Sequence, residues 1–214
     1  MPVYQLPEEN VFPHPSLAED DGLLAVGGDL SPERLILAYS NGIFPWYSEG
    51  TPILWWSPDP RTVLYPDEFK TSKSLRQSIR RENYAFSINK NFGDVIEACA
   101  SVPRLHDDNT WITNKMKAAY KRLHNMNYAW SVETWSSGKL AGGLYGIKIG
   151  SLFSGESMFY RKQDASKAAL KYLCENAENL NITMIDVQQS TQHLLSLGAK
   201  EITRADFLKA LSNM

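Results

Sequence analysis

Two polar side chains lie at the carboxyl end of a predicted buried strand. The apolar run ITMIDV covers residues 182–187, so that Asp186 and, two positions later, Gln188 come at its end. Residues two apart along a strand share a face, and acids at strand ends often face ligands. The alternative, about equally supported by the sequence alone, is that Asp186 caps the next helix or forms a turn. Asp186 and Gln188 are therefore candidates for a reaction centre.

A third candidate lies in a glycine-rich pair of predicted strands. The segment 143–159 reads GLYGIKIGSLFSGESMF and places Glu156 directly after Gly155. In a regular strand Glu156 and Met158 would share one face of the sheet, and Phe153 would point to the opposite face. A glycine often marks a bulge, which changes this order. Glu156 is either an exposed acid at the edge of a hairpin or a carboxylate beside an apolar pocket.

A proline-rich segment carries half of the tryptophans. Residues 43–61, IFPWYSEGTPILWWSPDPR, contain three of the six tryptophans together with four prolines, which exclude a regular helix. Unpaired RNA bases stack on aromatic rings, and a segment stiffened by proline would hold a ring in place before binding. We expect Trp46 and Trp111 to stack on bases, and Trp55 and Trp56 to fill the interface between two subdomains.

One predicted helix carries concentrated positive charge. The formal net charge of the chain is −2, yet residues 70–81 contain five cations and no acid: Lys70, Lys73, Arg76, Arg80 and Arg81. A charge run is usually a solvated helix face, but uncompensated cations are also typical of contacts with a phosphate backbone, which we favour. The helix that Thr113 is predicted to cap adds four more cations without an acid: Lys115, Lys117, Lys121 and Arg122.

Composition indicates an ordinary globular protein. The 214 residues are 43% hydrophobic and 21% charged, enough for one large domain or for a domain with a smaller companion. The N-terminus lacks the pattern of a signal peptide, and no apolar run approaches the roughly 18 residues of a membrane span, so we predict a cytoplasmic protein. Cys99 and Cys174 lie in apolar helical patterns and are predicted to be reduced core thiols, and the four histidines show no ligand-pair spacing, so no metal is expected.

Hydrophobic periodicity predicts an α+β fold with a mixed sheet. Helices are expected near residues 32–40, 72–82 and 92–101, from residue 114 onward, from Asp164 or Ser166 to about residue 179, and near residues 191–197 and 204–212. Strands are expected near residues 128–135, 139–150, 151–159 and 182–187. A meander followed by a strand–helix–strand unit also resembles a GNAT-like (acyltransferase-like) core, an analogy that names no reaction. We predict a small N-terminal domain with little regular structure over residues 1–64 and a GNAT-like catalytic domain over residues 65–214.

Several long motifs together resemble those of the bacterial leucyl/phenylalanyl-tRNA protein transferases. In the order of that family, and over roughly residues 22–211, the chain contains LLAVGGDLSPERLILAYSNGIFPW, WWSPDPR, TWIT, GGLYGIKIGSLFSGESMF, ASKAAL, IDVQ and HLLSLGA. It departs from the family in that many members continue beyond the position of Met214, and in Leu144 and Val187, where relatives often have methionine and cysteine.

The resemblance implies an activity. Leucine or phenylalanine, and less readily methionine, would be transferred from aminoacyl-tRNA to the α-amine of proteins with N-terminal arginine or lysine, which marks them for N-end rule degradation. It also implies a small N-terminal domain beside a GNAT-like domain, in agreement with the pattern of predicted elements.

The resemblance also assigns residues by motif position. It implies that Trp46 and Trp111 sandwich the terminal adenine of tRNA, and that Asp186, Gln188 and Glu156 lie at the reaction centre. The pocket for the transferred amino acid would be apolar and lined by Leu144, Phe153, Met158, Leu170 and Ile185.

The reaction is the aminolysis of an activated ester by an amine that is already partly neutral at pH 7. We expect Asp186, oriented through Gln188, to position the amine and help remove its proton. In the alternative, the ribose hydroxyl takes the proton and Asp186 only positions the amine. The cationic side chain of the acceptor needs an anion, which either Glu156 or Asp186 could supply.

The sequence also bears on three other classes of protein. An acetyltransferase would need a glycine-containing loop for the pyrophosphate of coenzyme A, and the corresponding connection YRKQDASK, residues 160–167, has no glycine. A tRNA-dependent ligase of the cell-wall type would be expected to be larger. A non-enzymatic RNA-binding module would leave Asp186, Gln188 and Glu156 unexplained. We therefore predict an aminoacyltransferase that needs no cofactor and acts as a monomer away from membranes.

Overall fold

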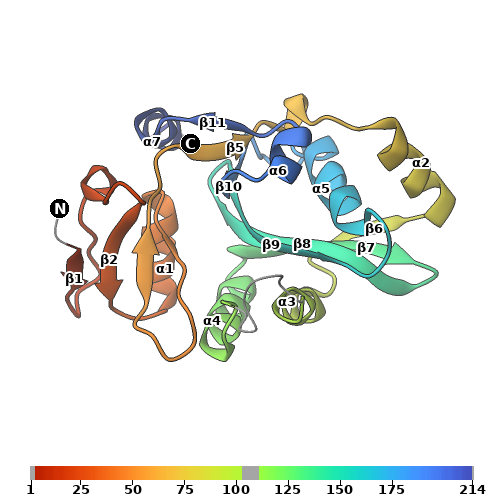
Figure 1. Ribbon diagram of the computed structural model, residues 1–214. Helices are drawn as coiled ribbons and strands as arrows, with labels where there is room; N and C mark the ends of the chain where they lie inside the picture. Colours follow the sequence, from red (N-terminus) through yellow and green to blue (C-terminus); the bar gives the residue numbers. More distant parts are fainter. Residues whose placement is uncertain (1–2, 103–110, 214) are drawn as a thin grey trace.

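Two sheets with helices packed around them make up the molecule (Figure 1). The computed structural model describes residues 3–102 and 111–213. Within these ranges the strands form one sheet of four strands and one mixed sheet of seven. The α+β fold class predicted from the sequence is confirmed.

The N-terminal part contains more regular structure than expected. Its sheet has the order β1-β2-β4-β3, with β1 Tyr4–Leu6, β2 Leu23–Gly27, β3 Phe44–Pro45 and β4 Leu54–Trp56. The expectation of little regular structure is therefore wrong, because strands of two to five residues are too short to show an alternating pattern. The predicted helix is confirmed as α1, Pro32–Ser40, which follows a 3-10 turn at Pro15–Leu17 and is capped by the Ser31 hydroxyl.

The larger sheet has the strand order β11-β5-β10-β9-β8-β7-β6. Its strands are β5 Arg61–Leu64, β6 Ala85–Ile88, β7 Ala129–Ser136, β8 Lys139–Ile149, β9 Leu152–Tyr160, β10 Met184–Gln188 and β11 Lys200–Ile202. The predicted meander is β7 to β9, and β10 pairs with β9 in the parallel sense, whereas the other neighbours are antiparallel. The division into domains at residue 64 stays a prediction; β5 already belongs to this sheet.

Helices cover both faces of the larger sheet (Figure 1). One face carries α3 Phe92–Ala100 and α4 Asn114–Asn125; the other carries α5 Ala165–Glu175 and α6 Gln192–Ser196. A 3-10 turn at Pro66–Glu68 precedes α2 Lys73–Glu82, which packs against α5, and α7 Arg204–Leu211 ends the fold. Side chains of Ser72, Thr113, Thr191 and Thr203 cap α2, α4, α6 and α7, which explains why their starts could be predicted.

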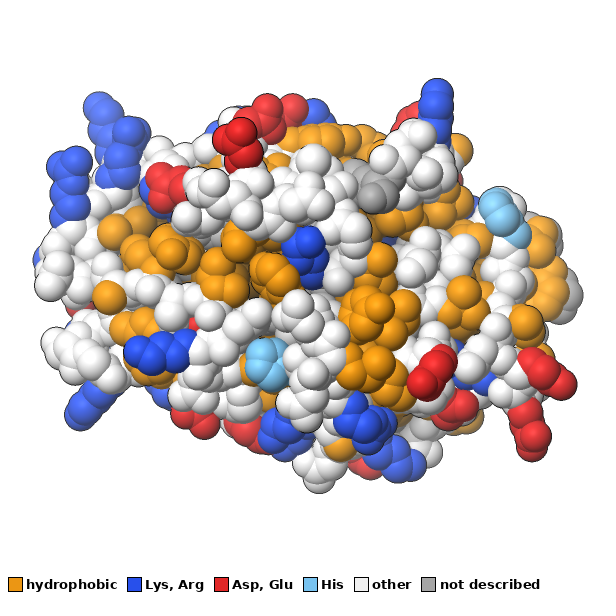
Figure 2. All heavy atoms as spheres, turned by 180° about the vertical axis from the view of Figure 1, so that it is seen from behind, with side chains coloured by type: hydrophobic (Ala, Val, Ile, Leu, Met, Phe, Trp, Pro, Cys, Tyr) orange, Lys and Arg blue, Asp and Glu red, His pale blue; other side chains and the backbone are white. Residues whose placement is uncertain are grey.

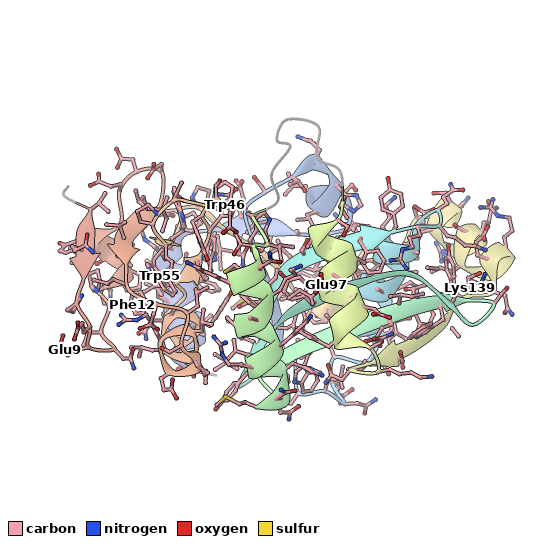
Figure 3. The ribbon with its side chains drawn as sticks, turned by 90° about the horizontal axis from the view of Figure 1, so that it is seen from below. Glu9, Phe12, Trp46, Trp55, Glu97 and Lys139 are labelled. Carbon is pink, nitrogen blue, oxygen red and sulfur yellow. The ribbon has the colours of Figure 1, made fainter. Side chains whose placement is uncertain are left out.

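The main apolar core runs from the N-terminal sheet into α3 and α4. Trp55 is fully buried in it, contacts the ring of Phe12 at 4.8 Å between centroids, and donates its indole N–H to the Gly27 carbonyl. Figure 3 labels Phe12 and Trp55 within the N-terminal part and Trp46 closer to the larger sheet. The predicted thiols Cys99 and Cys174 are both buried and reduced, as expected.

Candidate active site

A bulge in β9 determines which side chains face α5. Tyr145 of β8 pairs with Ser157 and Gly146 with Gly155, so that Glu156 is an extra residue without a partner in β8. The sequence allowed a bulge at Gly155, and the structure has one there. Because of this extra residue, side chains five positions apart, Phe153 and Met158, line the same cavity.

The apolar side chains predicted for amino-acid binding surround one cavity of about 250 Å³. All five line it: Leu144, Phe153, Met158, Leu170 and Ile185. Val187 and Leu194 add apolar surface, and Thr191 and His193 add polar groups from the α6 region. A small apolar hollow with few polar groups is suited to a single hydrophobic side chain.

The predicted stacking residues border a second cavity of about 310 Å³. Trp46 and Trp111 both line it, together with Phe44 and Pro45 of β3. Trp46 is 42% exposed, and its backbone carbonyl accepts a hydrogen bond of 2.8 Å from the indole N–H of Trp56. The structure thus brings the two tryptophans to one hollow that a flat ring could enter.

Glu156 lies where the two cavities meet. It lines both of them, as do Gln188 and three other residues: Val187, Thr191 and Leu194. Glu156 Oε1 accepts a hydrogen bond of 3.0 Å from Gln188 Nε2, and Oε2 accepts one of 3.0 Å from the Tyr120 hydroxyl, which is itself hydrogen-bonded to the Tyr39 hydroxyl.

Burial makes Glu156 titrate near neutral pH. Loss of solvent around the carboxylate raises the pKa of Glu156 to about 7, and the nearby charge of Asp186 acts in the same direction. The hydrogen bonds from Tyr39, Tyr120 and Gln188 partly oppose this rise. Glu156 is therefore close to half ionised at neutral pH, as suits a group that exchanges a proton.

Asp186 lies behind the point where the two cavities meet. It is 1% exposed and belongs to the lining of neither cavity. Its Oδ1 accepts 2.8 Å from Arg61 Nε and 2.9 Å from the Gln188 backbone N–H, and its Oδ2 accepts 2.7 Å from Arg61 Nη2 and 3.4 Å from the Ser154 hydroxyl. Each carboxylate oxygen thus already has two donors, which leaves no free acceptor site for a substrate amine.

The five cations predicted to contact tRNA are exposed and lie outside both cavities. They are Lys70 and four residues of α2, the helix at the end of the molecule away from the N-terminal sheet (Figure 1). Lys and Arg side chains gather at this end in the view from behind (Figure 2). Arg81 is partly compensated, because its Nε lies 3.0 Å from Glu82.

The positive charge of α4 is more compensated than its sequence suggested. Lys117 and Lys121 both contact Glu97, at 2.7 and 2.9 Å, a residue of α3 labelled in Figure 3. The helix itself contains no acid, but the expectation of uncompensated charge is wrong for these two lysines. The acid comes from a neighbouring helix 20 or more positions away, which a scan along α4 does not detect.

Three residues of the site were not identified from the sequence. Tyr120 was interpreted only as part of the apolar stripe of its helix, and Tyr39 and Arg61 carried no signal of their own. The one available hint for Arg61 is its place at the end of the WWSPDPR motif.

In residues 3–102 and 111–213 no cluster of His, Cys, Asp and Glu side chains is arranged to hold a metal ion. None of the helices in those ranges has the length and apolar character needed to cross a membrane.

Comparison with known proteins now identifies the family. The family model described as leucyl/phenylalanyl-tRNA protein transferase matches residues 63–212, and the model of the N-terminal domain of that family matches residues 28–59. Proteins named leucyl/phenylalanyl-tRNA–protein transferase are 56% identical in Syntrophobacter fumaroxidans and 54% identical in Desulfatibacillum aliphaticivorans. Each alignment covers 99% of this chain and 91% of the relative.

The family models and the named relatives define a transferase enzyme. The chain belongs to the leucyl/phenylalanyl-tRNA protein transferase family. The resemblance drawn from the motifs is confirmed.

Two solved structures of low sequence identity align with parts of this chain. L-PGS from Bacillus licheniformis aligns with a TM-score of 0.42 and 14% identity over 79% of this chain and 54% of the other. A GCN5-related N-acetyltransferase from Kribbella flavida aligns with a TM-score of 0.40 and 10% identity over 80% and 61% of the two chains.

Proposed function

We propose that the protein transfers leucine or phenylalanine, and less readily methionine, from aminoacyl-tRNA to the α-amine of proteins that begin with arginine or lysine. The product would be marked for N-end rule degradation in the cytoplasm. One observation carries this proposal: an apolar cavity and a tryptophan-lined cavity meet at Glu156 and Gln188.

The two cavities suit the two parts of an aminoacylated tRNA end. The terminal adenine stacks between Trp46 and Trp111, and the side chain of the esterified amino acid enters the apolar cavity. The ester then lies at the shared wall, beside Glu156 and Gln188. One methylene changes binding by only about 1–3 kcal/mol, so one slot accepts leucine, phenylalanine and methionine.

Transfer replaces an ester bond by a peptide bond. The α-amine of the acceptor attacks the carbonyl carbon and a C–N bond forms, while the bond from that carbon to the ribose oxygen breaks. The amine gives up one proton and the departing ribose oxygen gains one. Holding the amine and the ester at about 3–3.5 Å supplies much of the rate.

Glu156 is the carboxylate available to the acceptor. It borders both cavities, attracts a cationic acceptor, and can take the amine proton once ionised. Asp186 is committed to Arg61 and to the Gln188 backbone, which supports the alternative in which Asp186 positions groups and removes no proton. Gln188 orients Glu156 through their hydrogen bond.

The body of the tRNA lies along the basic surface formed by Lys70, Lys73, Arg76, Arg80 and Arg81. Their exposure supports contact with phosphates, which is independent of base identity. We also propose that the protein acts as a monomer.

Mixing the purified protein with leucyl-tRNA labelled in the leucine tests the proposal. The acceptors are matched peptides beginning with arginine or alanine, and a parallel reaction offers labelled acetyl-CoA as the donor. We expect label on the arginine peptide only, and only from tRNA. Label on both peptides would refute the acceptor preference, and transfer from acetyl-CoA alone would refute the donor.

A further inference from the structure

Arg61 lies behind the reaction centre and lines neither cavity. It is 1% exposed, and its guanidinium carbon lies 4.9 Å from the ring centre of Phe44 and 4.7 Å from that of Phe207. The two rings come from β3 and α7 and leave the planar group few alternative orientations. The N–H groups of the Arg61 guanidinium are therefore held toward the carboxylate of Asp186.

Asp186 connects Arg61 to Gln188 by hydrogen bonds. Asp186 Oδ1 accepts both Arg61 Nε and the backbone N–H of Gln188, at 2.8 and 2.9 Å. Gln188 has a φ of 66°, in the left-handed region, where β10 shifts its register against β5. Such a backbone is strained for a residue other than glycine, so it needs surrounding contacts to persist.

The unusual backbone of Gln188 determines where its side chain points. Its Nε2 reaches Glu156 Oε1 at 3.0 Å, which orients that carboxylate at the meeting point of the cavities.

We propose that Arg61 is a positioning residue for transfer: through Asp186 it fixes the backbone of Gln188 and thereby aligns Glu156 with the ester and the incoming amine. This inference rests on the proposed function. It assigns to Arg61 an effect on the rate of transfer, with little effect on the binding of the aminoacylated end.

A role in packing alone predicts something different. Replacing both members of a buried ion pair by apolar groups of similar volume is often neutral or stabilising, whereas removing one member leaves a costly buried charge. The double variant Arg61→Met/Asp186→Leu removes both charges together. If the pair only fills space, this variant should fold and transfer leucine normally.

The experiment compares wild type, the double variant and Arg61→Lys. It measures the single-turnover rate of leucine transfer at saturating acceptor, and separately the affinity for an adenosine carrying leucine through a stable 3′-amide. We expect the double variant to transfer about 100-fold more slowly, because a displacement near 1 Å can have that effect. Its affinity for the amide should stay at the wild-type value.

Arg61→Lys keeps Asp186 and a positive charge but loses the planar fork. We expect its transfer rate to lie between those of wild type and the double variant. Because Arg61→Lys keeps the Asp186 carboxylate, this decrease in rate would be due to the change at Arg61 alone. The lysine variant also carries the test if the double variant does not fold.

Arg34→Met is the matched control. Arg34 is also fully buried, but its Nη2 donates to the carbonyls of Pro7, Glu8 and Glu9, within the N-terminal part. We expect it to lower the melting temperature without changing the transfer rate at saturation.

Two results would overturn the inference: a wild-type rate in the tested variants, or a loss of amide affinity in proportion to the loss of rate. Absence of transfer by the wild type in the same assay would instead refute the proposed function, so the two failures are distinguishable.

Discussion

The side-chain nitrogen Nε2 of Gln188 lies 3.0 Å from Oε1 of Glu156, at the point where the apolar and the tryptophan-lined cavities meet. Both residues lie at irregularities of their strands: Glu156 is the extra residue of a bulge in β9, and Gln188 follows a register shift in β10. Bulges commonly redirect side chains next to active sites. Two regular strands would not bring these two side chains to the same point.

The titration of Glu156 predicts a dependence of stability on pH. Burial raises the pKa of Glu156 from 4.5 to about 7, so the folded protein holds this proton more tightly than the unfolded chain. Its contribution to stability is therefore complete below about pH 4.5 and is lost as the pH rises through 7. Tyr39 and Tyr120, which face it, remain neutral because burial raises each pKa well above 10.

The variant Glu156→Gln removes this titration. We expect wild type to lose about 1–3 kcal/mol of unfolding free energy relative to the variant between pH 5 and pH 8. Urea unfolding at several pH values measures the difference. Glu97→Gln is the control, because hydrogen bonds from Lys117 and Lys121 lower the pKa of Glu97 and so move its titration away from this range. A constant difference between wild type and Glu156→Gln across the range would contradict the assignment.

Replacing either cavity tryptophan should weaken donor binding. Base stacking on an aromatic ring is worth about 1–3 kcal/mol. Trp46→Ala and Trp111→Ala should therefore each raise the KM for leucyl-tRNA by the factor that corresponds to this loss of binding free energy. Trp130→Ala is the matched control, because Trp130 lies on β7 and lines neither cavity. Equal effects of all three replacements would argue against stacking at this site.

Enlarging the apolar cavity should change the choice of amino acid. Leu144 is 3% exposed and lines the cavity, and Leu144→Ala leaves space that phenylalanine fills better than leucine. We expect the ratio of kcat/KM for phenylalanine over leucine to rise about tenfold. Leu140→Ala, on the same strand but outside the cavity, should lower stability and leave the ratio unchanged. A ratio that moves equally in both variants would refute the assignment of this cavity.

The basic surface predicts a salt dependence of tRNA binding. If Lys73, Arg76 and Arg80 contact phosphates, replacing all three by alanine should make the slope of log affinity against log salt less negative by about one for each residue. Lys117 and Lys121, already paired with Glu97, should contribute less when replaced. An unchanged slope in the triple variant would show that the tRNA binds another face of the protein.

The elements that the sequence predicted are those with local signals. Ser31, Ser72 and Thr113 cap their helices through neighbouring backbone N–H groups, and Gly155 marked the bulge within its own segment. The apolar cavity and the two tryptophans could be assigned from motif resemblance, and the structure brings them together.

Contacts between distant positions could not be predicted. Arg61 and Asp186 are 125 positions apart, and Tyr39 and Tyr120 are 81 apart, so no window of sequence holds both members of either pair. For that reason the sequence favoured Asp186 as the group that handles the proton. In the structure Asp186 is buried beside Arg61, and Glu156 is the carboxylate that lines both cavities. The short strands β5, β6 and β11 were missed because three or four residues carry too little pattern.

The most direct test of the central claim is to sequence the product by tandem mass spectrometry after incubation of the protein with leucyl-tRNA and a peptide that begins with arginine and contains an internal lysine. The account predicts one added leucine, joined by a peptide bond to the α-amine of the arginine. Leucine on the lysine side chain, or an unmodified peptide after the tRNA ester has been consumed, would contradict it.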